Sequence, residues 1–508
     1  MNGKVYIVGV GPGDYKLITL KAVECIKKAD VIVYDRLIGR KILNFAKDNS
    51  EKIFVGKSPN NHSLSQYEIN RLLVEQAKKG KIVARVKGGD PFLFGRGGEE
   101  GVFLYENKIE FEIIPGITSA ISVPAYAGIP VTHRECCSSL HIITGHEREE
   151  KEKSSINYKE LAKIGGTLVF LMGVKNLPNI SKNLIKNGMK RLTPVAVVER
   201  GTTFDQRAIT GTLEDISHKV LEEKVSSPAA IVVGEVVNFR EKLDWFLKGT
   251  LRGKRVVVTR AREQASRLVD MIEDLGGEAL EFPTIKIEPP DSFDQFDRIL
   301  ENVRNYNWLV FTSPNGVKAF FERLRHKKID VRSLYNLKVA VIGKVTADEV
   351  EKIGINIDYM PDKYTTDELL KGMKKVITPS ERILLARSDI GSKELLDGLL
   401  ENGNNVTNVT VYKTSPAIED RKELLDLFKK GKIDFITFTS SSTVINFIKA
   451  VGRENLDKLS NTKVISIGPV TTKTAIENGI NVARQADEHT IAGLVTQLIQ
   501  LVQLGDGS

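Results

Sequence analysis

The chain has 508 residues, of which 41% are hydrophobic and 27% charged, so we expect a soluble globular protein with at least two domains and three or four lobes. No stretch approaches 18 consecutive apolar residues, and we therefore expect no membrane span and no membrane partner. The formal net charge of +9 favours acidic partners, but the basic residues alternate with acidic ones and do not cluster with aromatic residues, which argues against nucleic-acid binding.

The chain opens with an apolar stretch, VYIVGVG at 5–11, which predicts a buried strand that runs into a Gly-rich turn. Because this strand begins almost at residue 1, without a charged leader, we do not expect a signal peptide. The turn could be mistaken for a dinucleotide-binding fingerprint. However, Asp14 occupies the position where G-x-G-x-x-G needs its third glycine, so a nicotinamide cofactor is disfavoured.

An amphipathic helix is expected at 17–28, followed by strands at 30–35 and 52–57 that end in Asp35 and Lys57. Chargeable side chains at the carboxyl ends of neighbouring strands can face one cleft. They can also be ordinary surface residues, with Asp35 capping the next helix and Lys57 solvated in a loop. The spacing alone leaves both interpretations open.

The stretch RVKGGDPFLFGRGGEE at 85–100 combines a strand end with two glycine pairs. Gly88 and Gly89 come where the strand should stop, and they allow positive φ and close approach of a ligand to the backbone. Asp90 then supplies a carboxylate. The second pair, at 97–98, precedes two glutamates that suit the start of a helix. A ligand site at the carboxyl end of this strand is expected.

Strands, helices and Gly-rich turns continue to alternate as far as a short polar junction at 241–255, where a compact linker is expected between two domains. The further strands lie within 110–116, 140–146, 167–173, 193–201 and 229–237.

The second half contains an internal duplication. VFTSPNGVKAFF at 310 matches TFTSSSTVINFI at 437, and VVVTR at 256 matches ILLAR at 383, each 127 residues apart. VAVIGKVTADEV at 339 matches VISIGPVTTKTA at 464, 125 residues apart. Two copies of one α/β unit predict two similar lobes with a cleft between them. Turns that open helices at strand ends present N–H groups suited to carboxylates, although each Ser or Thr could also be only a helix cap.

The 85–100 stretch resembles the signature of uroporphyrinogen-III C-methyltransferases, over about the first 248 residues. Its companion motifs occur in order: VGVGPGD (8–14), PGITSA (115–120), AGIPVTHR (127–134), TLVFLMG (167–173), VERGTT (198–203) and SPAAIVVGEVV (227–237). The resemblance implies a two-lobed α/β methyltransferase domain of the tetrapyrrole type (class III) at 1–248. S-adenosylmethionine would be the cosubstrate, a tetrapyrrole with eight carboxylates would be the acidic partner, and we expect a homodimer through this domain.

The same resemblance assigns site residues. Asp35 falls on the family's proton acceptor and Lys57 on its proton donor. The expected contacts of the methyl donor are Pro12, Gly88, Gly89, Asp90, Leu93, Thr118, Ser119, Met172 and Gly201. Leu93 is a conservative departure from the isoleucine that is common in the family.

Residues from about 252 to 505 resemble uroporphyrinogen-III synthase through VFTSPNGV, RSDIGSKEL, VTVYKT and SIGPVTTKTA. The resemblance implies a bilobed α/β domain at 249–508, with one lobe formed by about 252–287 and 414–508 and the other by 288–413. Such enzymes close hydroxymethylbilane into uroporphyrinogen III. Tyr412 falls on the family's cleft tyrosine and breaks the internal symmetry, because residue 285 is its counterpart. The expected substrate-binding residues are Arg260, Ser313, Arg387, Ser440 and Thr471.

The two resemblances together imply a bifunctional enzyme that makes uroporphyrinogen III and methylates it at carbons 2 and 7 to precorrin-2, toward sirohaem or cobalamin. The few, badly spaced cysteines indicate a reducing, cytoplasmic setting. Two alternatives stay open: the first half could methylate a later corrinoid, and the second could be a bilobed binding module. Three cysteines are too few for a disulfide framework, and the seven histidines show no metal-ligand spacing, so no metal is expected. His326 and His489 lie outside the repeated motifs, so no acid–base pair is expected in the second half.

Overall fold

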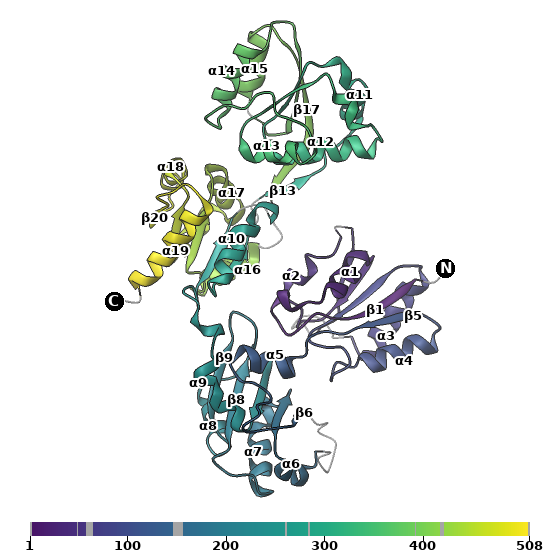
Figure 1. The fold of residues 1–508 in the computed structure, drawn as a ribbon, viewed down its shortest axis with the longest axis vertical. Coiled ribbons are helices and arrows are strands. Elements are labelled where there is room, and N and C mark those ends of the chain that lie inside the picture. Colours follow the sequence, from purple (N-terminus) through teal and green to yellow (C-terminus); the bar gives the residue numbers. More distant parts are fainter. Residues whose placement is uncertain are drawn as a thin grey trace. The chain divides into compact units, whose positions relative to one another are not determined.

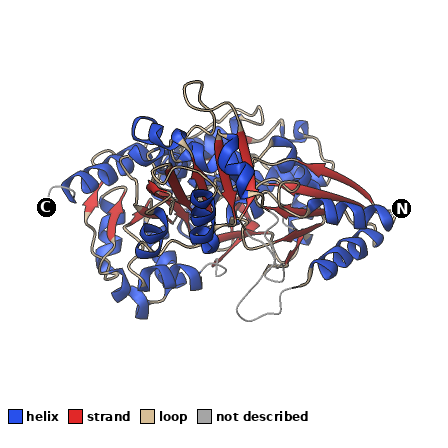
Figure 2. Ribbon diagram, turned by 90° about the horizontal axis from the view of Figure 1, so that it is seen from below, coloured by secondary structure: helices blue, strands red, loops and turns tan. Residues whose placement is uncertain are grey.

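The computed structural model describes residues 3–47, 49–56, 64–145, 156–259, 262–282, 285–391, 393–416 and 421–505. It divides into two compact units, Met1–Gly253 with Asp274–Glu278, and Lys254–Glu273 with Ala279–Ser508. Each unit contains two five-stranded sheets (Figure 1), and helices pack beside the strands (Figure 2). These four sheets confirm the predicted α/β class.

The first sheet of the amino-terminal unit is parallel, with the order β3-β2-β4-β1-β5. Its elements are β1 (Lys4–Gly9), η1 (Tyr15–Leu17), α1 (Leu20–Lys28), β2 (Val31–Tyr34), α2 (Arg40–Leu43), β3 (Glu51–Phe54), α3 (Gln66–Lys78), β4 (Val83–Lys87), α4 (Gly97–Glu106) and β5 (Glu110–Ile114). Alternate residues of β1 enter different cores, Val5 and Ile7 on one face and Val8 on the other. Both faces are therefore covered, as a parallel sheet requires.

The second sheet of this unit is mixed, with the order β6-β7-β10-β8-β9, in which only the β6–β7 pair is parallel. Its elements are α5 (Ser119–Tyr126), β6 (Leu140–Thr144), α6 (Tyr158–Ile164), β7 (Thr167–Leu171), η2 (Val174–Asn176), α7 (Leu177–Lys186), β8 (Pro194–Glu199), β9 (Arg207–Thr212), α8 (Ile216–Glu222), β10 (Ala229–Val233), η3 (Glu235–Phe239), α9 (Arg240–Leu243) and η4 (Phe246–Lys248). The edge strand β9 was not predicted, since its sequence, RAITGT, alternates weakly and carries a glycine.

In the carboxyl-terminal unit, one sheet has the order β12-β11-β18-β19-β20. Its elements are β11 (Arg255–Val258), α10 (Arg262–Asp274), β12 (Glu278–Glu281), α16 (Arg421–Lys429), β18 (Phe435–Phe438), α17 (Ser441–Val451), η7 (Arg453–Leu459), β19 (Lys463–Ser466), α18 (Pro469–Glu477), β20 (Arg484–Gln485) and α19 (Ile491–Gly505).

The other sheet of this unit has the order β13-β17-β16-β14-β15. Its elements are β13 (Ile285–Glu288), α11 (Asp294–Glu301), η5 (Val303–Asn305), β14 (Trp308–Phe311), α12 (Pro314–His326), η6 (Val331–Leu334), β15 (Lys338–Val341), α13 (Lys344–Glu351), α14 (Thr366–Val376), β16 (Arg382–Ser388), α15 (Lys393–Glu401) and β17 (Asn405–Pro416).

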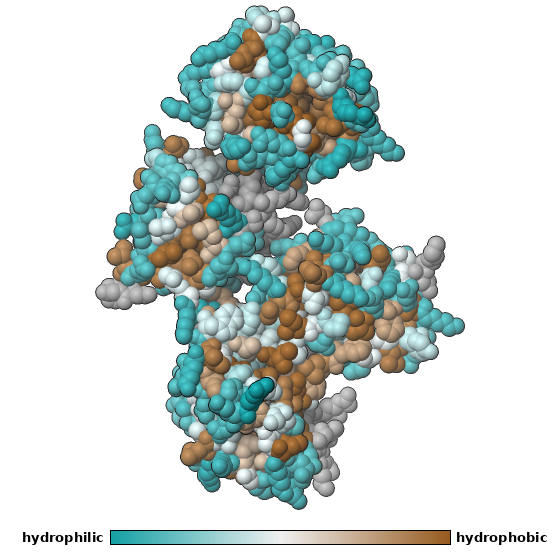
Figure 3. Space-filling model, in the orientation of Figure 1, coloured by the Kyte–Doolittle hydropathy of each residue, from teal (hydrophilic) through white to brown (hydrophobic). Residues whose placement is uncertain are grey.

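The internal duplication is visible in the strand order. The neighbours β11-β18-β19 in one sheet correspond to β16-β14-β15 in the other, which are the strands that the repeated motifs aligned. Each sheet therefore contains strands from both sequence copies. None of the described helices is long and apolar enough to cross a membrane. Hydrophilic residues predominate on the visible surface, with apolar residues in separate patches (Figure 3).

Candidate active sites

Three glycine turns meet at the carboxyl edge of the first sheet. Gly89 has φ +69° and forms an antiparallel bridge with Gly11, donating to its carbonyl at 2.6 Å and accepting from its N–H at 3.3 Å. A Cβ on Gly9 would lie 2.7 Å from the Gly89 oxygen, and one on Gly116 would collide with the same atom. The loops after β1, β4 and β5 can pack backbone to backbone only because glycine stands at these positions.

Asp90 ties two of these loops together. Its Oδ1 accepts hydrogen bonds from the N–H groups of Phe92 and Leu93, at 2.8 and 3.1 Å. Its Oδ2 accepts from the Gly116 N–H at 3.1 Å. Both carboxylate oxygens therefore already have backbone partners, and Asp90 shapes the turn as well as contributing negative charge to it.

The other predicted donor contacts are placed on several loops of the same unit. Pro12 follows β1, Thr118 caps α5 by accepting from the Ala120 N–H at 3.2 Å, and Ser119 begins that helix. Leu93 packs against the core of the second sheet.

Met172 and Gly201 lie where the backbone is strained. Met172 has φ +58° and is 51% exposed, and Gly201 lies between Arg200 and Thr202, with φ of 47° and 66°. A side chain on Gly201 would collide with Val123. Left-handed residues other than glycine cost energy and cluster at functional sites, so this geometry fits a binding site.

A polar network joins the loop after β1 to the second sheet of the unit. The Tyr126 hydroxyl donates to Asp14 Oδ2 at 2.9 Å, and the Asp14 N–H donates to the Thr202 hydroxyl at 3.1 Å. Burial and the neighbouring Asp14 raise the pKa of Tyr126. In the sequence Asp14 stood out only because it replaces the third glycine of a dinucleotide-binding fingerprint. In the structure it holds the loop after β1 against the residues around Gly201.

Asp35 lies directly after β2, with its side chain 27% exposed. Its Oδ1 accepts from the Leu37 N–H at 3.0 Å, and its Oδ2 lies 3.6 Å from the Arg85 guanidinium. It does not cap α2, whose N-cap is Gly39. Lys57, the predicted proton donor, lies outside the described residues.

A group of buried charges lies beside Asp35. The Glu100 side chain is 0% exposed, and its Oε1 accepts from Arg85 Nε at 3.1 Å, Lys87 Nζ at 2.9 Å and Gln66 Nε2 at 3.1 Å. Burial, and next the Arg85 charge, lower the pKa of Lys87. The two glutamates of the GGEE motif therefore differ, since Glu99 is exposed and paired with Arg96, and the sequence did not reveal this difference.

In the carboxyl-terminal unit the structure brings Tyr412 and Ser313 together. Their hydroxyl oxygens are 3.0 Å apart, and the Ser313 oxygen also accepts from the Gly316 N–H as the N-cap of α12. The pairing of β16 with β17 shifts register between Arg387 and Ser388, which is opposite Tyr412. A bulge of this kind changes the direction of the side chain that follows it. Tyr412 is only 7% exposed and packs in the core beside α12.

The remaining predicted synthase residues are less clearly assembled. Ser440 caps α17 in a reciprocal pair with Thr443. Thr471 is buried in the first turn of α18. Arg387 is buried at the end of β16, where its Nε donates to Asn408 at 2.7 Å and burial lowers its pKa. Arg260 lies outside the described residues.

His489 is a candidate that sequence reasoning missed. A Cβ on Gly468, the N-cap of α18, would lie 3.2 Å from the His489 ring. In the other copy, a Cβ on Gly343 would lie 2.8 Å from the Tyr364 ring. Residues 364 and 489 are 125 apart, the offset of the IG turns, so this offset could have revealed the histidine. His489 lies outside the repeated motifs in the sequence, but the fold brings its ring beside the IG turn at Gly468.

A cavity of about 220 Å³ lies beside the strand that carries Tyr412. Its lining residues are Pro290, Asp291, Ser292, Gln295, Phe296, Asp389, Val409, Thr410 and Lys413. Asp291 accepts from Lys413 at 2.6 Å, and this bond raises the pKa of the lysine.

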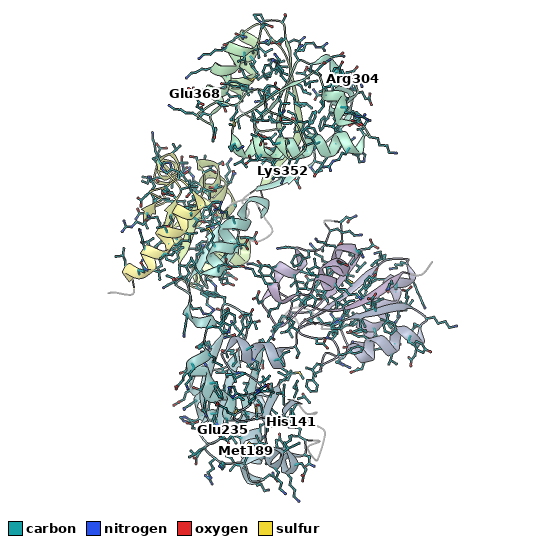
Figure 4. The ribbon with its side chains drawn as sticks, in the orientation of Figure 1. His141, Met189, Glu235, Arg304, Lys352 and Glu368 are labelled. Carbon is teal, nitrogen blue, oxygen red and sulfur yellow. The ribbon has the colours of Figure 1, made fainter. Side chains whose placement is uncertain are left out.

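Among the described residues there is no cluster of His, Cys, Asp and Glu suited to a metal. His141, which lies on β6 (Figure 4), for example, shares a hydrogen bond with Ser139, the residue before that strand.

Comparisons with known proteins match both halves. The model of the Tetrapyrrole (Corrin/Porphyrin) Methylases matches residues 4–217, and the model of Uroporphyrinogen-III synthase HemD matches residues 266–496. The chain is 39% identical over 500 residues to the porphyrin biosynthesis protein HemD of Ruminiclostridium josui, covering 98% of each chain.

Two further relatives are named as methyltransferases. The chain is 43% identical over 353 residues to a uroporphyrinogen-III C-methyltransferase of Bacillus subtilis (strain 168), covering 70% of this chain and 72% of that one. It is 56% identical over 241 residues to an S-adenosyl-L-methionine-dependent uroporphyrinogen III methyltransferase of Methanosarcina barkeri, covering 47% and 94%. These matches confirm both resemblances that the motifs indicated.

Proposed function

This chain belongs to the tetrapyrrole methylase and uroporphyrinogen-III synthase families, and we propose that its two halves catalyse consecutive reactions of porphyrin biosynthesis. The carboxyl-terminal half converts hydroxymethylbilane to uroporphyrinogen III. The amino-terminal half methylates that product at carbons 2 and 7 to give precorrin-2. The observation that carries the proposal is the 39% identity to a porphyrin biosynthesis protein over 98% of both chains, because one alignment then includes both halves.

S-adenosylmethionine is the methyl donor that we propose for the first half, and it would supply an electrophilic methyl group. The structure offers a test of fit. Among the described residues, only the Ser119 nitrogen would lie near a Cβ on Gly89, at 4.0 Å, so none of them fills the space beside this Cα. A ligand can therefore approach the backbone closely there. The strained residue Met172 and the turn at Gly201 would complete the site, with the Asp14–Tyr126 bond holding the two sides together.

We assign proton transfer in this half to Asp35 and Lys57. Asp35 is partly exposed at the carboxyl edge of the sheet, beside the Gly88–Gly89 turn that begins one strand away. A carboxylate there can accept the proton that the macrocycle loses after methylation, and proton transfer by a positioned group typically contributes about 10²–10⁴-fold in rate. The larger share comes from in-line positioning of the ring carbon against the donor.

In the second half we propose that catalysis rests on positioning. The hydroxyls of Ser313 and Tyr412 and the helix N-termini of α13 and α18 would hold the carboxylates of the flexible bilane. Tyr412 would help the terminal hydroxyl to leave. His489, beside Gly468, adds one titratable group to this set.

Two assays test the function directly. Incubation with uroporphyrinogen III and S-adenosylmethionine should add two methyl groups by mass spectrometry, whereas an enzyme for a later corrinoid would leave this substrate unchanged. Hydroxymethylbilane closes unaided to the type I isomer, so the proportion of type III isomer measures the synthase. A binding module would leave that proportion at zero.

We further propose a cytoplasmic homodimer that associates through the methyltransferase half. Exposed apolar side chains on α3 and α4 support this, namely Tyr67 (62% exposed), Val102 (59%) and Tyr105 (76%). Light scattering on the purified chain should give twice the mass of 56.4 kDa, and the monomer mass would contradict the proposal.

A further inference from the structure

The buried charges beside Asp35, those of Arg85, Lys87 and Glu100, are not needed to stabilise the fold. Arg85 and Lys87 alternate along β4 and are 3% and 6% exposed, although the strand otherwise consists of valine and alanine. Buried ion pairs are often no more stabilising than well-packed apolar residues, because each charge loses its hydration. A cation pair in the central region of a parallel sheet therefore calls for a functional reason.

Glu100 is the residue on which this group converges. Its Oε1 accepts from Arg85, Lys87 and Gln66, which come from two different elements, while its Oε2 has no hydrogen bond among the described residues. A buried carboxylate oxygen without a partner is costly and uncommon in native proteins. Three donors therefore bond to Oε1 of Glu100, whereas Oε2 is left without a donor among the described residues.

Among the described residues, the charges of this group balance only when Asp35 is included. Arg85 and Lys87 carry two positive charges against the single negative charge of Glu100, and Asp35 Oδ2, 3.6 Å from Arg85, supplies the second. Arg85 also donates to the backbone oxygens of Val33 and Val86, which fixes its guanidinium between β2 and β4. From α3 the neutral side chain of Gln66 donates to Glu100 and also to Asn70.

We propose that Glu100 is a positioning residue for methyl transfer, which holds the Arg85–Lys87 pair so that Arg85 keeps Asp35 in place at the carboxyl edge of the sheet. The proposal rests on the proposed function, because it gives a task to Asp35 as the proton acceptor. The Glu100 side chain is 0% exposed, so we expect it to act on the reaction through the Arg85–Lys87 pair and not by contact with a ligand.

The test compares Glu100→Gln with the double variant Glu100→Gln/Lys87→Met. In Glu100→Gln the buried group carries one excess positive charge, so we expect kcat for methyl transfer to fall by up to about 10²-fold, as displaced catalytic groups typically cause. Calorimetry should show an unchanged donor affinity, because the glycine turns remain intact.

The pH dependence separates this account from a merely structural role. Glu100 is one of the groups that raise the pKa of Lys87 against burial and Arg85, so its neutralisation should lower that pKa further. The profile of kcat against pH should therefore change in Glu100→Gln and return toward the wild-type profile in the double variant, which lacks Lys87. Val74→Ala, in the neighbouring core, controls for lost stability and should leave the profile unchanged.

A folded Glu100→Gln variant with the wild-type kcat and pH profile would overturn the proposal. Should that variant not fold, Glu100→Asp keeps the charge but shortens the reach, so it should lower kcat and spare donor affinity, and wild-type values would refute the idea. If the wild-type enzyme methylates uroporphyrinogen III while the variants behave like it, only this inference fails. If the wild type does not methylate, the proposed function fails.

Discussion

Replacement of Gly89 by alanine separates backbone strain from ligand contact. Gly89 has φ +69°, and a left-handed conformation costs a residue with a Cβ about 1–2 kcal/mol. Among the described residues the new Cβ meets only the Ser119 nitrogen, at 4.0 Å, so no clash with them adds to this cost. We therefore expect the melting temperature to fall by about 2–8 °C and the protein to remain folded.

The strain is present with and without a ligand, so it cancels from the free energy of donor binding. Any loss of donor affinity then reports how closely the ligand approaches this Cα. We expect calorimetry to detect no binding of S-adenosylmethionine to Gly89→Ala, with the synthase reaction unchanged.

Gly253→Ala is the control. Gly253 has φ +75°, close to that of Gly89, and a Cβ at this position would meet no described atom within 4 Å, so its substitution should cost a similar loss of stability and leave donor binding intact. Wild-type donor affinity in Gly89→Ala would refute the assignment of the donor site to this turn.

Three further predictions concern the other groups. Asp35→Asn should lower the rate of methyl transfer by about 10²–10⁴-fold. Donor affinity in calorimetry should stay unchanged, because the Asp35 side chain contacts Arg85 and the Leu37 N–H rather than the glycine turns. Loss of both donor binding and turnover would contradict this role of Asp35. Tyr412→Phe removes the hydrogen bond to Ser313, so it should reduce type III isomer formation more than Ser313→Ala or Thr471→Val does, and some activity should remain. If a folded His489→Ala variant formed no type III isomer at all, acid–base catalysis would be favoured instead. The hydrogen bond from Arg323 lowers the pKa of Asp297 in the folded protein. The ionised Asp297 therefore stabilises the fold above the pKa of about 4 that it has in the unfolded chain, and this stabilisation is lost as the pH falls. The stability of Asp297→Asn should consequently depend less on pH in acid than that of the wild type.

Much of the fold could be predicted because apolar runs and glycine turns are local signals. The strand at 83–87 and the helix from Gly97 follow from the sequence directly. The mixed second sheet could not be predicted, since strand direction depends on pairing that no local pattern reveals. The burial of Glu100 beside an exposed Glu99 is similar, because neighbouring helix residues point about 100° apart and only packing decides which is inside.

The synthase site shows the same limit. The motifs indicated Ser313 and Tyr412, but their contact depends on a register shift in β17 that the sequence does not mark. His489 could not be found from the strand-end motifs, because its ring reaches the Gly468 turn from the segment between β20 and α19.

A single incubation of the purified protein with hydroxymethylbilane and S-adenosylmethionine shows whether one chain performs both reactions in sequence. We expect a product with the mass of doubly methylated uroporphyrinogen III. Gly89→Ala should stop at the unmethylated type III isomer, and Tyr412→Phe should yield mostly the type I isomer. Unmethylated type I uroporphyrinogen from the wild-type protein would contradict the proposed sequence of reactions.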